Sequence, residues 1–369
     1  MIKSAAPSLE ERLKRMISAT GPISVADYMS LCLSDPQDGY YTSQQPIGSG
    51  GDFITAPEIS QLFGELLGIW MLAIWQQSNR PTPFHLVELG PGRGTLMSDM
   101  IRAIATDKEA AKHLHIHLVE ISPTLRHEQE KALHGLSGSK FWHESLDTLP
   151  EAPLFMVGNE FFDCLPIHQW VFHKSHWHER VIGLDAEGHL RFGLGPLRAI
   201  SSQQEAAENG AILERSPASE AIMRTISAHL ALHGGAGLFI DYGYDAPSYG
   251  DTFQAMRHHS YADPLTNPGA HDLTAHVNFD ALRKQATEEL AKAPPCPMAA
   301  RPVISQGDFL LAMGLLQRAG QLGTGQSPQT QAKITQAVER LAAPEQMGTL
   351  FKCLALMPEK TSLPPAALT

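Results

Sequence analysis

Residues 84–97 read Phe84-His85-Leu86-Val87-Glu88-Leu89-Gly90-Pro91-Gly92-Arg93-Gly94-Thr95-Leu96-Met97. The first six residues, among them the acid Glu88, have the composition of a buried strand, and three glycines at alternating positions follow. From Thr95 onward, apolar residues recur at helical spacing: Leu96, Met100, Ile101 and Ile104. The stretch predicts a strand, a tight loop and a helix of a nucleotide-binding α/β sheet. The glycines let the backbone approach a ligand, and the start of the helix offers free N–H groups to it.

The position of the third glycine indicates which ligand this loop binds. A dinucleotide fingerprint, G-x-G-x-x-G, needs a glycine where this chain has Thr95, so a nicotinamide-dependent oxidoreductase is disfavoured. The pattern present is E-x-G-x-G-x-G, from Glu88 to Gly94, which resembles the first motif of class I S-adenosylmethionine-dependent methyltransferases. The carboxylate of that cofactor suits the positive end of a helix, and its ammonium and sulfonium suit a carboxylate such as Glu88. Gly90, Gly92, Gly94 and Thr95 are therefore candidate cofactor-binding residues, and the alternative is a tight turn that binds nothing.

Composition limits the class of partner. The chain has 369 residues, 43% of them hydrophobic, and a formal net charge of −11. Without an excess of Lys and Arg to neutralise phosphates, a nucleic-acid substrate is disfavoured and a basic protein or peptide is favoured. The four cysteines have no metal-ligand spacing, and no Cys or carboxylate completes a set with His113, His115 and His117, so we expect no metal site. No apolar run reaches membrane-spanning length and no leader is evident, which predicts a cytoplasmic protein without membrane insertion.

Two later strands also end in polar residues. Residues 115–120 read as a strand that ends in Glu120, an acid placed to accept hydrogen bonds from ribose hydroxyls or, alternatively, to cap the next helix. A short strand at 141–143 would bring Leu146 near the adenine. Residues 153–158 form a compact apolar strand followed by Asn159, Glu160, Phe161, Phe162 and Asp163. Because ligands of open α/β sheets bind beyond the carboxyl ends of the strands, we expect this cluster to face the reacting centre.

Several further motifs carry a resemblance that extends over most of the chain. They are residues 51–58 (Gly51 to Glu58), 88–95, 119–123, 159–166, 241–243, 263–265 and 272–277. Together they resemble the MidA-type protein arginine methyltransferase family, which includes the mitochondrial respiratory complex I assembly factor 7. The resemblance implies a protein substrate, possible participation in complex I assembly, and S-adenosyl-L-methionine as cofactor. Asn278 departs from the family pattern, in which an aspartate is expected.

The residues suggest a mechanism in which a carboxylate orients the acceptor. A guanidinium is protonated at cellular pH and is a poor nucleophile, but a carboxylate can hold it and accommodate the departing proton. Glu160 is the first candidate for this catalytic role and Asp163 the second. Phe161 and Phe162 are candidate pocket walls, although one of them could be core, and Asn159 is a candidate cofactor ligand or turn cap. Further candidate substrate-binding residues are Asp241, at the end of a core strand, and His258 and His276 in a polar insertion.

The predicted architecture is a Rossmann-like α/β methyltransferase sheet with an N-terminal helical extension and an inserted β-meander. We expect the extension and a loop at 1–80, the methyltransferase domain at 81–357 with insertions at 165–215 and 245–280, and a flexible tail at 358–369. The loop from Gly48 to Phe53 is a candidate lid. The apolar meander could be buried within the chain or in a homodimer. An alternative function is a non-catalytic assembly protein that retains the cofactor fold.

Overall fold

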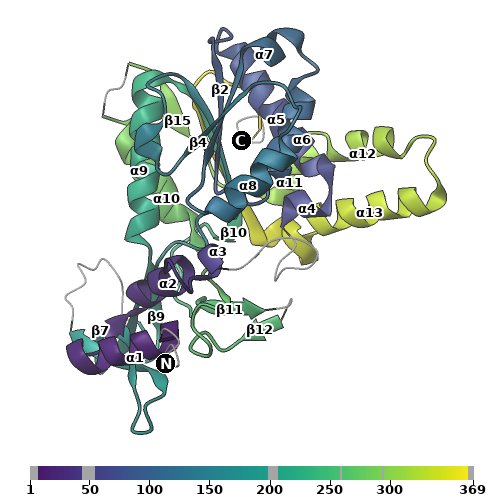
Figure 1. Cartoon of the computed structure of the whole chain (residues 1–369). Coiled ribbons are helices and arrows are strands. Elements are labelled where there is room, and N and C mark those ends of the chain that lie inside the picture. Colours follow the sequence, from purple (N-terminus) through teal and green to yellow (C-terminus); the bar gives the residue numbers. More distant parts are fainter. Residues whose placement is uncertain (1–6, 44–54, 198–206, 258–259, 293–294, 365–369) are drawn as a thin grey trace, which may run out of the picture. The chain divides into compact units, whose positions relative to one another are not determined.

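The computed structural model describes residues 7–43, 55–197, 207–257, 260–292 and 295–364, and Figure 1 shows the course of the chain. The chain divides into two compact units. Unit 1 comprises Met1–Phe53, Asp163–Ser219 and Pro247–His276. Unit 2 comprises Ile54–Phe162, Glu220–Ala246 and Val277–Thr369. Each unit is therefore assembled from segments that lie far apart in the sequence.

Within the described residues, unit 2 contains a nine-stranded sheet. Its strands run in the order β15 (Met298–Ala300), β17 (Phe351–Pro358), β10 (Gly235–Tyr244), β5 (Leu154–Asn159), β2 (Phe84–Leu89), β3 (Leu114–Val119) and β4 (Ser139–His143), with β14 (Val277–Asn278) on β10 and β16 (Ile304–Ser305) on β17. The five strands from β10 to β4 are parallel, and β17 is antiparallel to β10. The chain leaves β2 toward β3 and then returns to β5 on the other side. This switch point is where open α/β sheets bind ligands, and the predicted fold class is confirmed.

Helices cover both faces of this sheet (Figure 1). α5 (Gln61–Gln77), α6 (Thr95–Ile104) and α8 (Pro123–Ala132) lie on one face, and α9 (Pro217–His233) and α10 (Phe279–Leu290) lie on the other. α5 and α6 approach closely because α5 has glycines one turn apart. A Cβ added at Gly68 would lie 2.8 Å from the carbonyl oxygen of Met100. The other helical segments are α4 (Ala56–Ile59), α7 (Lys108–His113), η1 (Leu146–Thr148), α11 (Gln306–Ala312), α12 (Leu315–Gly323), α13 (Pro328–Ala342) and η2 (Pro344–Gly348).

Unit 1 joins the N-terminal helices to the two insertions. Its elements are α1 (Leu9–Thr20), β1 (Ile23–Ser24), α2 (Val25–Ser34), α3 (Tyr40–Ser43), β6 (His168–His173), β7 (His176–Leu184), β8 (Leu190–Leu197), β9 (Ile212–Arg215), β11 (Gln254–Arg257), β12 (Ser260–Ala262) and β13 (Asp272–Thr274). Ser8 and Ser24 form capping boxes that start α1 and α2. The expected meander is present as antiparallel strands β6 to β9, and β1 pairs with β7. Leu13 and Met29 share a buried core with Ile182 of β7, so the N-terminal helices bury apolar residues of the meander.

The units differ from the domain division predicted from sequence. The predicted boundary at residue 80 separates α5 from the sheet, whereas α5 packs on α6 inside unit 2. Of the residues before α5, Met1–Phe53 belong with the insertions. Sequence patterns record local apolar periodicity and give no information on which segments pack together. The insertion at 245–280, expected to be irregular, contains a three-stranded sheet in the order β12, β11, β13. In the predicted flexible tail, the Pro364 carbonyl accepts a hydrogen bond of 2.7 Å from the buried Trp70 indole, and residues 365–369 lie outside the described residues.

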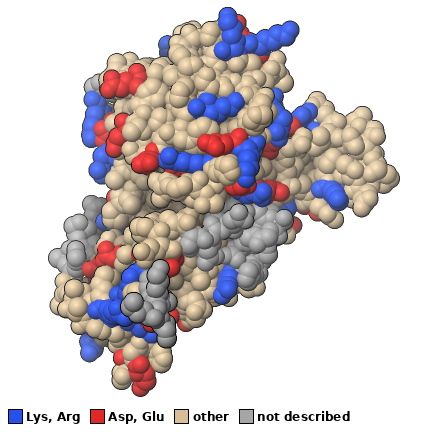
Figure 2. All heavy atoms as spheres, in the orientation of Figure 1, with Lys and Arg blue, Asp and Glu red and all other residues tan. Residues whose placement is uncertain are grey.

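The charged surface and the cysteines can be compared with what the composition of the chain predicted. The face drawn in Figure 2 carries basic and acidic side chains interspersed among other residues. Cys32, Cys164, Cys296 and Cys353 are all free thiols. In the part of the chain that the structure describes, no helix has both the length and the apolarity needed to cross a membrane.

Candidate functional site

The glycine loop has the backbone that its sequence predicts. Gly90, Gly92 and Gly94 have φ values of 59°, 53° and 82°, a region that other residues adopt at a cost. Gly90 also faces an aromatic ring, because a Cβ added there would lie 3.1 Å from Cδ2 of Phe161. Gly94 is the N-cap residue of α6 and has no side chain of its own to cap this helix start. The Met97 N–H in the first turn of α6 donates to Glu88, and the N–H groups ahead of it can serve a ligand with a negative charge.

Glu88 supplies a buried acid at the end of β2. Its side chain is 3% exposed, and its Oε2 has no hydrogen-bond partner among the described residues. Burial raises the pKa of Glu88 well above the ordinary value; a hydrogen bond from the Met97 backbone lowers it, and the nearby Glu120 raises it further. A cationic ligand would favour the ionised form of this carboxylate. The loop and Glu88 together fit the carboxylate, ammonium and sulfonium of S-adenosylmethionine.

The carboxylate of Glu120, just after β3, accepts hydrogen bonds from the backbone N–H groups of Ile121 and Ser122 and from the Gln129 amide. The backbone N–H of Ser122 donates to Oε1 at 2.8 Å, and the Gln129 amide donates to Oε2 at 3.2 Å. Burial raises the pKa of Glu120, while these hydrogen bonds and the Arg126 charge lower it. Ser122 is the N-cap of α8, so Glu120 also supports a helix start, as the alternative interpretation proposed. Leu146 opens η1 after β4 and is half-buried.

Glu160 occupies a strained turn at the end of β5. Its φ of 50° is left-handed, which is uncommon for a residue with a side chain, and its N–H donates to the Ile240 carbonyl at 2.9 Å. Its Oε1 accepts hydrogen bonds from the Ala56 backbone at 3.2 Å and from the Asn159 amide at 3.1 Å. The Oδ1 atom of Asn159 is buried without a hydrogen-bond partner among the described residues. The turn thus fixes a carboxylate next to an amide at the carboxyl end of the sheet.

Asp241 supports this turn from β10. It is fully buried, and its Oδ2 accepts the backbone N–H groups of Phe161 at 3.0 Å and Phe162 at 2.9 Å, while its Oδ1 accepts that of Tyr242 at 3.0 Å. Phe162 is 3% exposed and packs edge-on against Phe239, with ring centroids 5.7 Å apart. The structure therefore places Phe161 beside the glycine loop, Phe162 in the core, and Asp241 as a brace of the backbone.

The remaining candidates belong to unit 1 or lie outside the described residues. Asp163 is 7% exposed, and its carbonyl accepts a hydrogen bond from the Ala275 backbone at 2.9 Å. The backbone N–H of His276 donates to Thr252 Oγ1 at 2.9 Å, and burial lowers the pKa of the imidazole. His258 and the candidate lid from Gly48 to Phe53 are outside the described residues.

Two site residues were not predicted. The Thr95 hydroxyl donates to Oε1 of Glu58 at 2.6 Å, so an acid from α4 reaches the first residue of α6. Gln129 of α8 is fully buried and contacts both the glycine loop and Glu120. Glu58 lies within a motif noted in the sequence, but no periodicity identifies its partner. In the sequence, Gln129 could be noticed only as an amide side chain in the helical segment that follows Glu120.

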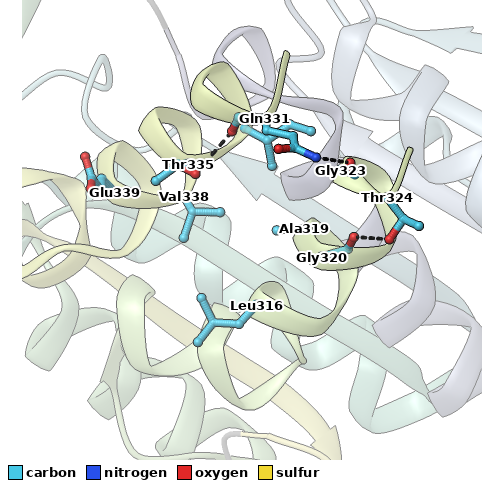
Figure 3. A pocket seen from close by; sticks show the side chains of 10 residues that line it. Leu316, Ala319, Gly320, Gly323, Thr324, Gln331, Thr335, Val338 and Glu339 are labelled. Atoms are coloured by element: carbon cyan, nitrogen blue, oxygen red, sulfur yellow. Dashed lines mark hydrogen bonds between the residues drawn. The ribbon is translucent and has the colours of Figure 1, made fainter. Parts of the chain in front are cut away.

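A groove of about 400 Å³ also opens in unit 2, between α12 and α13. Figure 3 shows Leu316, Ala319 and Val338 among its lining side chains, together with the hydrogen bond of 3.0 Å from the Gln331 amide to the Gly323 carbonyl. Its lining is apolar or small except for a few polar groups, of which Glu339 alone is ionisable. The groove contains none of the predicted site residues.

Comparison with known proteins agrees with this geometry. Residues 66–296 match the family described as "Putative S-adenosyl-L-methionine-dependent methyltransferase". The chain is 36% identical to "Protein arginine methyltransferase NDUFAF7, mitochondrial" of Danio rerio, covering 95% of this chain and 87% of that protein. It is 35% identical to the Homo sapiens protein of the same name, covering 93% and 82%. A crystal structure from Burkholderia thailandensis, bound to S-adenosyl-homocysteine, is similar with a TM-score of 0.83 and 28% identity, covering 96% of this chain and 93% of that one.

These matches decide between the alternatives drawn from sequence. The cofactor is S-adenosyl-L-methionine, and the non-catalytic alternative is not favoured, since the relatives are named as enzymes. The expected cytoplasmic location is wrong by the same comparison, because the curated relatives are named as mitochondrial proteins. The prediction failed because composition and apolar runs do not report the compartment of a protein. With one family model matching more than half of its length and curated relatives matching nearly all of it, the chain belongs to the S-adenosyl-L-methionine-dependent methyltransferase family.

Proposed function

We propose that this enzyme methylates an arginine of a partner protein and that Glu160 orients the acceptor. The carrying observation is the position of the Glu160 carboxylate. It is fixed by the Ala56 N–H and the Asn159 amide, and the next residue, Phe161, lies against Gly90 of the cofactor loop. Glu160, Asn159 and the loop all belong to unit 2. A rigid acid beside the methyl-donor loop is what a poorly nucleophilic guanidinium requires.

The residues of the donor site divide the tasks of cofactor binding. We assign Glu88 to the cationic part of the methionine end, the N–H group of Thr95 at the start of α6 to its carboxylate, and Glu120 to the ribose hydroxyls. Leu146 and Asn159 are proposed to complete the contacts. When bound, the cofactor supplies a methyl group on a positively charged sulfur.

The chain's own chemistry then concerns the acceptor. Glu160 pairs with the guanidinium, orients one terminal nitrogen, and accommodates the proton that this nitrogen releases. Asp163 is the second candidate for this role. Phe161 is proposed to exclude water from the reacting nitrogen, with Phe162 and Asp241 supporting the wall from behind. His258 and His276 are proposed substrate contacts from the insertion.

The acceptor is proposed from the relatives. They are named as arginine methyltransferases, and the sequence motifs resemble a family of complex I assembly factors. A subunit of respiratory complex I is therefore the first protein to examine, in a role in the assembly of that complex. The homodimer suggested by the meander stays a prediction, which sedimentation velocity would check.

Replacement Glu160→Gln tests the proposal. The amide keeps the size of the side chain and an acceptor oxygen for the Ala56 N–H, but it cannot pair with a guanidinium as a carboxylate does. We expect S-adenosyl-homocysteine to bind with unchanged affinity by calorimetry. Methyl transfer should fall about 10²- to 10⁴-fold, measured as methylarginine by mass spectrometry in cells that carry the variant instead of the parent protein.

Asp163→Asn is the matched comparison, because it also replaces an acid by its amide. If Asp163→Asn abolishes transfer while Glu160→Gln does not, the two catalytic assignments are exchanged. If cells with and without the parent protein have the same methylarginine sites, arginine is not the acceptor.

A further inference from the structure

Gln129 joins three parts of the donor site through one buried amide. Its Nε2 donates to the Gly92 carbonyl at 2.8 Å and to Oε2 of Glu120 at 3.2 Å. Its Oε1 accepts a hydrogen bond from the indole of Trp142 at 2.9 Å. The side chain is 0% exposed, so these contacts use both donors and the acceptor of the amide. The Gln129 backbone also lies under the loop, because a Cβ added at Gly94 would be 3.4 Å from its Cα.

The contact with Glu120 matters because that carboxylate is buried among other charges. The charge of Glu120 raises the pKa of Glu88 of β2, whereas the charge of Arg126 of α8 lowers the pKa of Glu120 and favours its ionised form. From β4, the His143 carbonyl accepts the Glu120 backbone N–H at 2.9 Å. The Gln129 amide donates to Oε2 of Glu120 and the Ser122 N–H donates to Oε1, and the Ile121 N–H also donates to this carboxylate. A donor to an ionised carboxylate both fixes its rotamer and stabilises its charge.

We propose that Gln129 is a positioning residue for cofactor recognition, which holds Glu120 toward the ribose diol and ties it to the glycine loop at Gly92. The proposal rests on the assigned role of Glu120. The N–H groups of Ser122 and Ile121 and the amide of Gln129 occupy three of the roughly four acceptor positions of the carboxylate, so an acceptor position remains for a ribose hydroxyl. The Trp142 indole keeps the amide of Gln129 in the orientation that presents Nε2 to both acceptors.

Calorimetric titration with S-adenosyl-homocysteine between pH 6 and pH 8.5 tests this with two opposite substitutions. Gln129→Leu removes the donor, so we expect binding to weaken at least tenfold, and to weaken further as the pH falls and Glu120 takes up a proton. Gln129→Glu places a second carboxyl beside Glu120. At low pH the introduced carboxyl is protonated and can donate, so binding should stay near that of the parent protein. At high pH the two carboxylates repel, and the affinity should fall.

The affinity for the 2′-deoxy analogue of S-adenosyl-homocysteine is a second measurement that tests the proposal. Because it lacks one of the hydroxyls that Glu120 would accept, Gln129→Leu should weaken its binding less than that of the parent ligand. Gln306→Leu is the matched control, since Gln306 is also 0% exposed and donates to a backbone carbonyl, that of Leu341, at 2.8 Å. It should lose stability without any change in the pH profile of binding.

The outcomes separate this inference from the function on which it rests. If Glu120→Gln binds S-adenosyl-homocysteine as the parent does, the ribose assignment fails and the role of Gln129 fails with it. If Glu120→Gln weakens binding but both Gln129 variants keep the parent pH profile, only the inference is overturned. Should Gln129→Leu fail to fold, the change with pH in the S-adenosyl-homocysteine affinity of Gln129→Glu decides alone.

Discussion

At the scale of single residues, the donor site depends on backbone conformations that few side chains tolerate. Gly90 has a φ of 59° and lies under the ring of Phe161, while Glu160 keeps a φ of 50° despite having a side chain. The Glu160 turn persists because Asp241 accepts the next two backbone N–H groups. Strain of this kind costs about 1–3 kcal/mol and is found where surrounding contacts hold it in place. The Phe161 ring, which follows Glu160 in the chain and contacts Gly90, therefore connects the strained acid with the strained loop.

Gly90→Ala should therefore impair the cofactor loop. The added methyl group combines a left-handed φ, which costs about 1–2 kcal/mol, with a contact of 3.1 Å to Phe161. We expect the affinity for S-adenosyl-homocysteine to fall about tenfold or more, measured by calorimetry, since each factor of ten corresponds to about 1.4 kcal/mol.

Gly135→Ala provides the control for backbone strain alone. Gly135 has a φ of 76°, and no atom lies within 4 Å of an added Cβ. Its substitution should lower the stability of the protein and leave the cofactor affinity intact. Equal losses of affinity in the two variants would show that the Phe161 contact is irrelevant.

At the scale of elements, three parallel strands are joined by a chain of histidines. His85 of β2 contacts His117 of β3 at 2.9 Å between ring nitrogens, and His117 contacts His143 of β4 at the same distance. His143 in turn contacts the hydroxyl of Thr148 at 2.9 Å. His117 is 4% exposed, and burial, followed by the neighbouring histidines, lowers its pKa to about 3. Burial also lowers the pKa of His85 and of His143.

The sheet should therefore lose stability in mild acid. Unfolded His117 has a pKa near 6.5, so between pH 6.5 and about 3 the unfolded chain binds a proton that the folded chain does not. The stability present above pH 6.5 is lost as the pH falls, by at most about 1.4 kcal/mol per pH unit for this one group. Urea unfolding at several pH values would measure the slope.

His117→Gln should make that slope shallower, since the amide does not titrate. His127→Gln is the control, because the His127 side chain is 66% exposed and solvent surrounds it in both states. An unchanged slope in His117→Gln would mean that other groups cause the acid sensitivity.

At the scale of the whole molecule, the described residues include two separate buried cores. One contains Leu66 and the sheet of unit 2, and the other contains Leu13 and the meander of unit 1. All proposed donor-site residues belong to unit 2. Damage to the core of unit 1 should therefore reduce stability without reducing cofactor affinity.

Leu13→Ala tests this separation. Leu13 is 1% exposed, and its truncation should cost about 2–5 kcal/mol of unfolding free energy. Calorimetry on the folded variant should give the parent affinity for S-adenosyl-homocysteine. Leu66→Ala, at a position 2% exposed in the core of unit 2, is the comparison that should impair both properties. A large loss of affinity in Leu13→Ala would contradict the separation.

The sequence alone determined the parts of the protein that depend on neighbouring residues. The strand, glycine loop and helix of 84–104 and the strand at 154–159 follow from apolar periodicity and turn chemistry, which act over a few positions. The cofactor class followed from the spacing of Glu88 and three glycines.

Only the tertiary structure decided which distant groups meet. Gln129 reaching Gly92, Glu58 reaching Thr95, and Asp241 bracing the turn after Glu160 are contacts between segments whose separation along the chain reveals nothing about their separation in space. The same reason explains why the N-terminal helices and two insertions form one unit. Burial of apolar surface drives that assembly, and it is not directional, so the sequence pattern shows which faces become buried but not against which partner.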